Sequence, residues 1–321
     1  MTVSSNTRKS RFVGAFLGCA FGDVLGSAVE MQSRSEILLQ YPELMRDFLP
    51  SDRGIGFGCY TDDTELTLAL ARSILRCGGV DGADCAAAYA EAFTPQRGYG
   101  RSAIKVLSAL QKGADWRCTG TMLFAEGSFG NGGAMRIAPV GLLYGHLGYL
   151  MLYRKVRAAV WMTHSHAEGI DAALLQARAV GLMLAADLPP KAEVFINQLR
   201  RYAPESILNG KLELLAELLN RQADADEVAD TFECGVRSAD SWPPALWAAL
   251  RYIDDPEEAI IQAVNLGGDT DTIGAMTGAL VGALHGDKWF PARWFDQLEN
   301  QQNGRDELIA VAGQLATISI S

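Results

Sequence analysis

Cysteine and histidine are scarce in this chain, which narrows the kinds of site it can form. Its 321 residues include six cysteines and four histidines. No two cysteines form a CxxC pair, so neither a disulfide scaffold nor a cysteine-rich zinc site is expected. Nucleophilic catalysis has little support, because no GxSxG motif is present. Sparse, unpaired thiols are typical of a reducing compartment, and we expect a cytoplasmic protein.

Long apolar runs and an excess of positive charge are missing as well. No segment reaches the ~20 clean apolar residues of a membrane-spanning helix, so no membrane association is expected. The 38 acidic residues outnumber the 28 basic ones and give a formal net charge of −10. This balance argues against a broad electrostatic grip on nucleic-acid phosphates.

The N-terminus has the basic and apolar parts of a signal peptide but lacks its other features. Arg8, Lys9 and Arg11 precede an apolar run over residues 12–21. Asp23 interrupts this pattern early, and no convincing small-residue cleavage site follows it closely. We therefore expect that the chain is not exported.

Alternating strand patterns are hard to find, whereas apolar residues at helical spacing recur along the chain. The spacing of Leu66, Leu70 and Ile74 is one example. Further helices are predicted over residues 170–186, 212–219, 243–252 and 256–264, the last two opening with proline. Gly, Pro and polar residues predict loops over residues 32–58, 112–133 and 187–191.

No predicted loop has the length or low complexity of an interdomain linker, so one domain is expected. The sequence predicts an all-α protein that forms a single compact orthogonal helical bundle over residues 11–321. Residues 1–10 are expected to form a disordered N-terminal tail. We also expect a monomer.

Glycine recurs at every fourth residue in two segments near opposite ends of the chain. One runs from Gly14 to Gly26 and the other from Gly274 to Gly286. Residues four apart lie on one face of a helix, so each segment would carry a groove without side chains. Glycine costs up to about 1 kcal/mol per interior helical position relative to alanine, so the pattern needs a packing reason. We predict that these two helices pack closely at the centre of the molecule, with their polar ends near one another.

Two short acidic clusters share one composition although they are far apart in the chain. They are Thr61-Asp62-Asp63-Thr64 and Asp269-Thr270-Asp271-Thr272, the second following a Gly-Gly pair. Each precedes an apolar helical pattern, so both could simply cap helix N-termini. If they converge, their oxygen atoms form the ligand set that Mg²⁺ or Mn²⁺ prefers, and a cation would offset the repulsion between carboxylates. Spacing alone leaves both interpretations open.

A glycine-rich stretch over residues 127–133, GSFGNGG, could bring its backbone close to a ligand. Its N–H groups could bind phosphate oxygens, and Phe129 could offer a ring to a nucleobase. A turn-rich connection is the alternative, because the stretch is neither a P-loop nor a GxGxxG dinucleotide motif. Further along, Thr163-His164-Ser165-His166 favours a helix-start cap or a ligand contact over a zinc site.

Taken in order, these motifs resemble the ADP-ribosylglycohydrolase family, which includes the dinitrogenase reductase-activating glycohydrolases and the ADP-ribosyl-acceptor hydrolases. The resemblance spans nearly the whole chain. It rests on GCAFGDVLG (18–26), YTDDT (60–64), residues 127–136, Thr163-His164 and VNLGGDTDTIG (264–274). RGYG (97–100) and GSFGNGGAMR (127–136) are most similar to the subgroup that removes serine-linked ADP-ribose and can degrade poly(ADP-ribose).

The resemblance implies an all-α fold in which the two acidic clusters meet, at helix N-termini and loops, around a binuclear Mg²⁺ or Mn²⁺ centre. The implied metal ligands are Thr61, Asp62, Asp63, Asp269, Asp271 and Thr272. The implied binding residues are Gly98 and Gly100, then Ser128, Gly130, Asn131 and His164 for diphosphate and ribose, and Phe129 for adenine. Glu30 matches a glutamate that the serine-type subgroup places on a mobile flap, and Glu30 and Asp62 are the implied catalytic residues, with Glu30 as the acid.

The implied function is metal-dependent removal of ADP-ribose from modified proteins or other conjugates. The bond cleaved is the glycosidic bond at C1 of the distal ribose, with an O-linked, serine-type acceptor. Three alternatives stay open: an arginine-linked ADP-ribose N-glycohydrolase, a non-catalytic ADP-ribose-binding protein, and a metal-dependent phosphohydrolase acting on a diphosphate.

Overall fold

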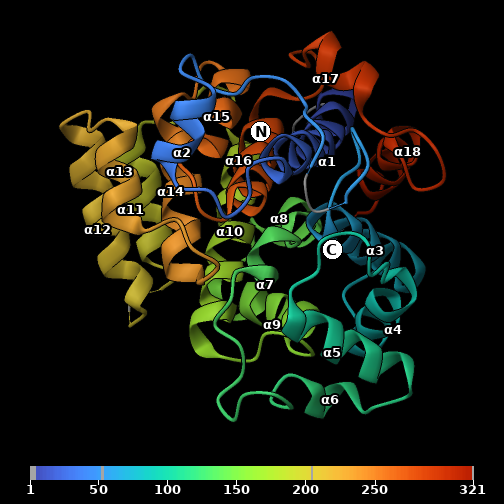
Figure 1. Ribbon diagram of the computed structural model, residues 1–321. Helices are drawn as coiled ribbons and strands as arrows, with labels where there is room; N and C mark the ends of the chain where they lie inside the picture. The colour runs from blue at the N-terminus through green and yellow to red at the C-terminus, as the bar shows by residue number, and fades with distance from the viewer. Residues whose placement is uncertain (1–4, 52–53, 204, 320–321) are drawn as a thin grey trace.

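The computed structural model describes residues 5–51, 54–203 and 205–319, and α-helices are the only regular elements within these ranges (Figure 1). The predicted all-α fold is therefore confirmed. In chain order the helices are α1 (Ser5–Ser27), α2 (Arg34–Gln40), α3 (Asp62–Cys77), α4 (Gly82–Ala92), α5 (Arg101–Gln111), α6 (Trp116–Thr119), α7 (Gly132–Met135), α8 (Ala138–Tyr144), α9 (Tyr149–Val160), α10 (Ala167–Ala185), α11 (Ala192–Arg200), α12 (Ile207–Asn220), α13 (Ala225–Phe232), α14 (Ser238–Arg251), α15 (Pro256–Val264), α16 (Thr270–His285), α17 (Ala292–Gln297) and α18 (Arg305–Leu315).

Helices α1 and α16 run antiparallel through the centre of the molecule with their backbones in direct contact. A Cβ atom added to Gly18 would lie 2.2 Å from Gly278 O, and one added to Gly22 would lie 2.1 Å from Gly274 O. Cβ atoms essentially never come within 3.0 Å of another heavy atom, so the contact requires glycine. The predicted packing of the two glycine-rich helices is confirmed. We call this contact the glycine seam; it comprises Gly14, Gly18, Gly22 and Gly26 of α1 with Gly274, Gly278 and Gly282 of α16.

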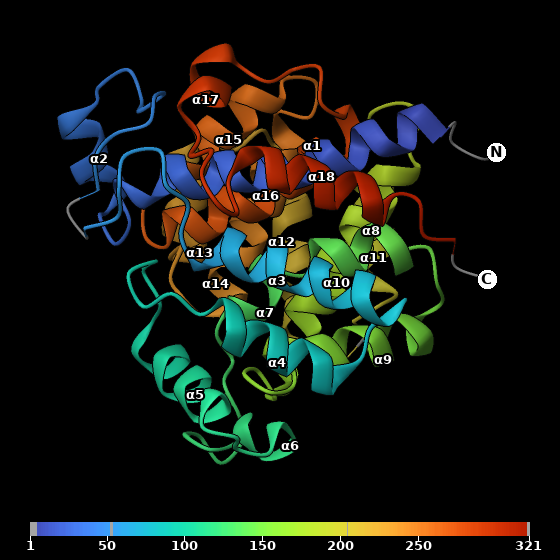
Figure 2. The same ribbon diagram turned by 90° about the vertical axis from the view of Figure 1, so that its right-hand side faces the viewer.

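The surrounding helices enclose the glycine seam. Helices α10, α14 and α15 pack against α16, while α3 and α18 pack against α1. Figure 2 shows that α5 and α6 lie at the periphery, away from this central pair. At the end of the seam near Gly26, Thr270 Oγ1 donates to Gly26 O at 2.7 Å, which joins the start of α16 to the end of α1. The polar ends of the two helices are therefore close together, as predicted.

Helix α1 begins earlier than the sequence analysis predicts. It starts at Ser5, so the predicted disordered tail is wrong for residues 5–10, while residues 1–4 lie outside the described residues. The first turns are held by tertiary contacts, since Ser10 Oγ donates to Asp287 Oδ1 at 2.5 Å and Arg8 donates to Ile318 O at 3.1 Å. These partners come from the far end of the chain, which local sequence patterns do not reveal.

Helix α14 corrects the prediction that a helix opens with Pro243. The helix begins at Ser238, so Pro243 and Pro244 lie inside it. Two backbone donors are missing there, but the helix is anchored by buried Trp242, whose Nε1 donates to Gln176 Oε1 at 3.0 Å. Tertiary packing therefore overrides the local preference of proline for a first helical turn.

Two of the three predicted loops contain short helices. Helix α2 lies within residues 32–58 and opens with a capping box formed by Ser33 and Glu36. Helix α6 and the start of α7 lie within residues 112–133. Residues 187–191 connect α10 to α11 without regular structure, as predicted.

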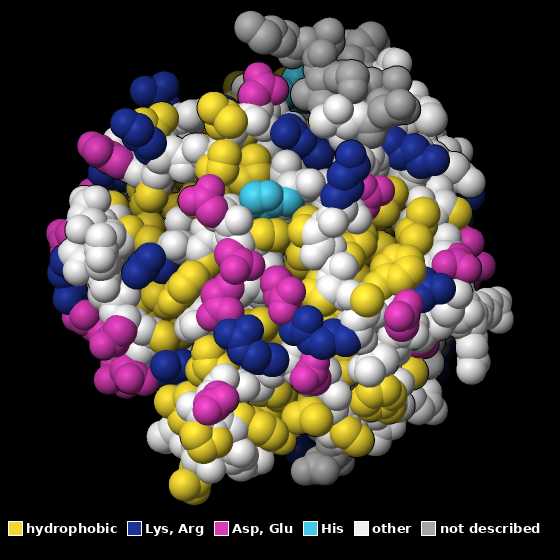
Figure 3. Space-filling view, turned by 90° about the horizontal axis from the view of Figure 1, so that it is seen from above, with side chains coloured by type: hydrophobic (Ala, Val, Ile, Leu, Met, Phe, Trp, Pro, Cys, Tyr) yellow, Lys and Arg dark blue, Asp and Glu magenta, His cyan; other side chains and the backbone are white. Residues whose placement is uncertain are grey.

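The described surface carries both signs of charge. The face seen from above in Figure 3 shows acidic and basic side chains interspersed, without a continuous basic stripe. Within the described ranges, no helix combines the length and the apolar character needed to cross a membrane.

Candidate active site

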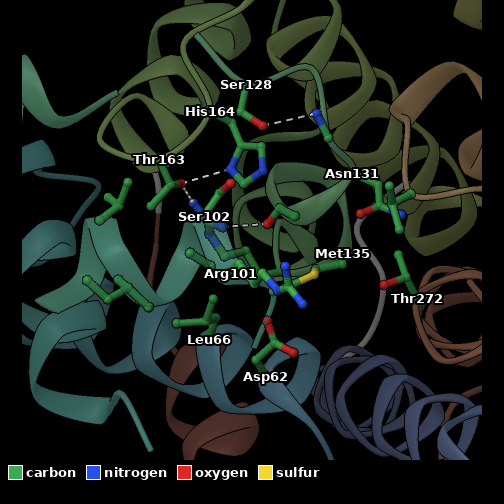
Figure 4. A pocket seen from close by; sticks show the side chains of 18 of the residues that line it. Asp62, Leu66, Arg101, Ser102, Ser128, Asn131, Met135, Thr163, His164 and Thr272 are labelled. Atoms are coloured by element: carbon green, nitrogen blue, oxygen red, sulfur yellow. Dashed lines mark hydrogen bonds between the residues drawn. The ribbon is translucent and has the colours of Figure 1, made fainter. Parts of the chain in front are cut away.

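A cavity of about 420 Å³ lies where the N-terminal ends of α3, α5 and α16 meet residues 127–133, which we call the glycine loop. In Figure 4, Asp62 and Ser128 lie on opposite sides of it. The cavity brings together every predicted site residue except Thr61: Glu30, Asp62, Asp63, Gly98, Gly100, Ser128, Phe129, Gly130, Asn131, His164, Asp269, Asp271 and Thr272. Residues that are far apart in the sequence therefore line the same cavity.

The two acidic clusters converge, together with the glutamate that follows α1. Carboxylate oxygens of Glu30, Asp269 and Asp271 lie within 4.8 Å of one another. Asp62 and Asp63 open α3 on the same cavity, and Thr272 lies in the first turn of α16. These side chains offer only oxygen ligands, which is the donor set of a hard divalent cation.

The electrostatics of the cluster indicate that a cation fits it. Burial, followed by repulsion from Asp271, raises the pKa of both Asp63 and Asp269 well above the ordinary aspartate value. Asp63 Oδ1 is buried and accepts no hydrogen bond. A buried carboxylate oxygen without a donor is costly, and a divalent ion would satisfy it and offset the repulsion.

Thr61 is not among the residues that line the cavity, and it caps α3 beside them. Its side chain is fully buried and accepts from Asp63 N–H at 3.3 Å. Asp23 of α1, also fully buried, accepts from Thr61 N–H at 2.9 Å and from the Thr64 hydroxyl at 2.6 Å. Burial raises the pKa of Asp23 to about 7. Asp23 thus fixes the start of α3 against α1.

Asp23 was not assigned a role from the sequence. The sequence did mark this residue as unusual, because it is a single acidic residue in a glycine-rich apolar helix. An ionisable group at such a position needs a specific partner, but the sequence does not say which one.

The glycine loop is pinned to the start of α14 and to the acidic cluster. Asn131 N–H donates to Val236 O at 3.0 Å, and Ser238 N–H donates to Phe129 O at 3.1 Å. Asn131 Nδ2 also donates to Asp269 Oδ2 at 2.5 Å. The loop predicted to bind phosphate and the cluster predicted to bind metal are therefore joined by a direct hydrogen bond.

Phe129 is available at the mouth of the cavity. Its side chain is 51% exposed. The ring forms a T-shaped pair with His166 at 5.7 Å between centroids, and Arg237 lies 5.6 Å from the centroid of Phe129. Arg237 is held by Glu168 through two contacts of 2.8 Å. An oriented, exposed ring at this position suits stacking with a planar ligand.

His164 faces the glycine loop as a neutral imidazole. Burial, followed by the charge of Arg136, lowers the pKa of His164 to about 3. Its Nδ1 lies 2.9 Å from Thr163 Oγ1, and Arg136 donates to that same oxygen at 2.6 Å. The sequence analysis assigned no role to Arg136, although this residue ends the motif GSFGNGGAMR (127–136).

Arg97 clamps the segment that carries Asp62. Its carbonyl accepts from Asp62 N–H at 2.8 Å, while its guanidinium donates to Tyr60 O at 2.7 Å. The guanidinium also pairs with Glu65 at 3.4 Å and with Glu299. Both sides of Thr61 are thereby fixed. The sequence motif contains Arg97, but Glu299 could not be connected to it from sequence alone.

Comparisons with known proteins agree with this arrangement. The family model described as ADP-ribosylglycohydrolase matches residues 4–320. ADP-ribosylhydrolase ARH3 of Bos taurus is 30% identical over 91% of this chain and 90% of its own length. ADP-ribosyl-[dinitrogen reductase] glycohydrolase of Rhodospirillum rubrum is 29% identical over 94% of this chain and 97% of its own length. A solved structure described as an ADP-ribosylglycohydrolase-related protein complex has a TM-score of 0.75 and 28% identity, covering 98% of this chain and all of its own.

Proposed function

Because the chain belongs to the ADP-ribosylglycohydrolase family, and is therefore an enzyme that hydrolyses ADP-ribosyl bonds, we propose that it is a metal-dependent hydrolase of modified proteins or other ADP-ribose conjugates. The bond cleaved is the glycosidic bond at C1 of the distal ribose. The observation that carries this proposal is the hydrogen bond from Asn131 to Asp269, which joins the glycine loop to the acidic cluster. A diphosphate on the loop would place the adjoining ribose beside the carboxylates.

In this proposal the acidic cluster would hold two Mg²⁺ or Mn²⁺ ions. The residues that would hold them are Thr61, Asp62, Asp63, Asp269, Asp271 and Thr272. When bound, the ions supply Lewis acidity and offset the negative charge of the carboxylates.

The remaining roles, which are proton donation, orientation of the ribose and binding of the diphosphate and adenine, fall to side chains and backbone of the chain itself. We assign Glu30 the role of the acid that protonates the leaving oxygen, because the oxocarbenium-like cleavage of an O-glycoside requires one. Glu30 lies in the turn after α1, whereas Asp269 and Asp271 are fixed at the start of α16. Asp62 would orient the reacting ribose from the opposite helix. Ser128, Gly130 and the backbone of the loop would bind the diphosphate, and Phe129 the adenine, with Gly98 and Gly100 leaving room for the ligand.

For the acceptor, we propose an O-linked, serine-type conjugate, with poly(ADP-ribose) as a related substrate. The support is the likeness of residues 97–100 and 127–136 to the serine-type subgroup, together with the similarity to ARH3. An arginine-linked N-glycohydrolase is the second candidate, favoured by the similarity to the Rhodospirillum rubrum enzyme over nearly the full length.

The test offers matched serine-linked and arginine-linked mono-ADP-ribosylated peptides with Mg²⁺, Mn²⁺ or a chelator. Release of ADP-ribose is followed for the wild-type protein, for Asp271→Ala and for Asp254→Ala, whose aspartate is exposed and outside the cavity. We expect metal-dependent release by the wild type and Asp254→Ala and none by Asp271→Ala. The linkage that reacts identifies the acceptor.

The products separate the alternatives. AMP in place of ADP-ribose would indicate a phosphohydrolase, and tight ADP-ribose binding without any product would indicate a binding protein. Either result would reject glycosidic cleavage of these acceptors.

A further inference from the structure

Arg136 is a buried cation beneath the glycine loop, with no carboxylate beside it. Its side chain is 1% exposed, and it lines the cavity. Among the described residues, no Asp or Glu lies within ion-pair distance of it, and its Nε has no hydrogen-bond partner. Its guanidinium lies 4.6 Å from the ring centroid of Tyr89, which offers only a partial counterpart to the charge. A buried charge without a counter-charge is costly, so an anion that enters the cavity would complete it.

The guanidinium contacts both walls that surround the ligand space. It donates to Gly132 O in the glycine loop and, at 2.6 Å, to Thr163 Oγ1. Figure 4 shows Thr163 joined to His164, whose Nδ1 lies 2.9 Å from Thr163 Oγ1. Arg136, Thr163 and His164 therefore form a continuous chain of hydrogen bonds.

The direction of the Thr163 hydroxyl decides where His164 carries its proton. The hydroxyl has two acceptors in reach, His164 Nδ1 at 2.9 Å and Val160 O at 3.2 Å. Val160 O already accepts from the backbone N–H groups of Thr163 and His164. With its two lone pairs filled, Val160 O is the weaker acceptor, so the shorter contact to Nδ1 is the favoured one for the hydroxyl proton. A neutral imidazole then carries its proton on Nε2.

His164 Nε2 faces the glycine loop at close range. A Cβ atom added to Gly132 would lie 2.9 Å from Nε2, and one added to Gly130 would lie 3.5 Å from it. Nε2 therefore lies beside the loop backbone, and a proton on it would make a donor suited to a phosphate oxygen.

We propose that Arg136 is a positioning residue that fixes His164, through Thr163, as the Nε2–H tautomer, and that its unpaired positive charge selects ligands carrying phosphate at the glycine loop. The inference rests on the proposed function only in taking ADP-ribose as the ligand.

The tautomer is read first in the unaltered protein by ¹⁵N–¹H NMR of the histidine side chains. The chain has four histidines, so His164→Gln suffices to assign the signals. We expect the protonated-nitrogen signal at Nε2 and the unprotonated one at Nδ1. Thr163→Ser keeps this pattern, whereas Thr163→Val, which has no hydroxyl, loses it. A proton on Nδ1 in the wild type would overturn the proposed tautomer.

The charge is tested by binding of ADP-ribose and adenosine to Arg136→Met, with Arg154→Met as an exposed control. Loss of charge-assisted contacts is expected to weaken ADP-ribose binding about tenfold to a hundredfold, while adenosine binding stays within about twofold of the wild type. Equal losses for both ligands would mean that Arg136 only supports the fold and would overturn the charge selection.

Failure of this inference differs from failure of the proposed function. If Arg136→Met binds ADP-ribose as the wild type does, the charge selection is wrong and the hydrolase proposal stands. If the wild type does not bind ADP-ribose, the proposed function fails along with the charge selection, and the NMR experiment still decides the tautomer. If Arg136→Met does not fold, Arg136→Lys takes its place and is expected to keep the preference for ADP-ribose over adenosine while shifting the His164 signals.

Discussion

At the scale of single residues, His164 should make the stability of the protein sensitive to acid. Burial and the charge of Arg136 lower its pKa in the folded state from the ordinary value of 6.5 to about 3. Between these values the unfolded chain binds a proton that the folded chain does not. The free energy of unfolding therefore falls as the pH drops below about 6.5. Because the two states differ by at most one proton at this residue, the slope is at most about 1.4 kcal/mol per pH unit, and the partial exposure of His164 reduces it.

This pH dependence is measured by urea unfolding at several values between pH 6.5 and pH 4.5. His164→Asn should lose stability less steeply on acidification than the wild type, while His146→Asn, at an exposed position, should follow the wild type. Parallel curves for wild type and His164→Asn would contradict the buried neutral state.

The residue scale also shows where sequence reasoning stops. Asp62, Asp63, Asp269 and Asp271 could be recognised because the same residue types occur twice before helical patterns. Asp23 and Arg136 belong to no such repeated pattern. Their roles follow only from their hydrogen-bond partners in the folded chain. Thr61 matched the ligand pattern, yet its burial as the cap of α3 follows from tertiary contacts.

At the scale of helices, the glycine seam should tolerate no side chain. The Cβ atom of Gly18→Ala would meet Gly278 O at 2.2 Å, so α1 and α16 would have to separate. We expect a loss of about 3 kcal/mol or more in the free energy of unfolding, at the upper end of overpacking effects. Gly210→Ala in α12 is the matched control, because open space surrounds its position, and it should gain up to about 1 kcal/mol.

Chemical denaturation of both variants tests the seam. A Gly18→Ala protein as stable as the wild type would show that the two helices do not pack backbone to backbone. The spacing of the glycines made this contact predictable, since each groove is visible in the sequence of its own helix.

The Arg97 guanidinium joins Tyr60, Glu65 of α3 and Glu299, so its loss should destabilise the start of α3. Arg97→Met leaves the carboxylates of Glu65 and Glu299 without their cation at a mostly buried position. We expect about 3 kcal/mol of destabilisation together with weaker divalent-ion binding, because the guanidinium no longer holds Tyr60 O and the segment that carries Asp62 is less firmly fixed. Arg72→Met breaks a more exposed pair with Glu307 and should cost no more than about 1 kcal/mol. Calorimetric Mg²⁺ titration and urea unfolding measure both effects, and equal behaviour of the two variants would reject the clamp.

At the scale of the whole molecule, divalent cations should stabilise the fold. The carboxylates of the cluster repel one another in the folded state. A ligand that binds the folded state alone, at a hundred times its dissociation constant, adds about 2.7 kcal/mol to the free energy of unfolding. We expect Mg²⁺ or Mn²⁺ to raise the melting temperature and a chelator to reverse the shift.

Asp271→Asn provides a sharper form of this experiment. Removing one repelling carboxylate should leave the metal-free protein as stable as the wild type or more so, while the stabilisation by Mg²⁺ disappears. Asp254→Asn, at an exposed position outside the cavity, should keep the full response. Retention of the Mg²⁺ shift in Asp271→Asn would place the cation elsewhere.

The all-α class and the central helix pair could be predicted because both depend on periodicity within single segments. The start of α1, the prolines inside α14 and the partners of Arg97 could not, because each depends on residues from distant parts of the chain. Local preferences were outweighed there by burial and by long-range hydrogen bonds.

The glycine seam also bears on how the protein is made. Helix α1 is synthesised well before α16, because α2 to α15 lie between them in the chain. Until then the bare groove of α1 has no partner, and the carboxylates of α3 have no counterpart from α16. Contacts between such distant segments close slowly and expose apolar surface in the meantime. The candidate site therefore cannot form until α16 has been synthesised, and chains that terminate before α16 would lack both the central helix pair and one of the two acidic clusters.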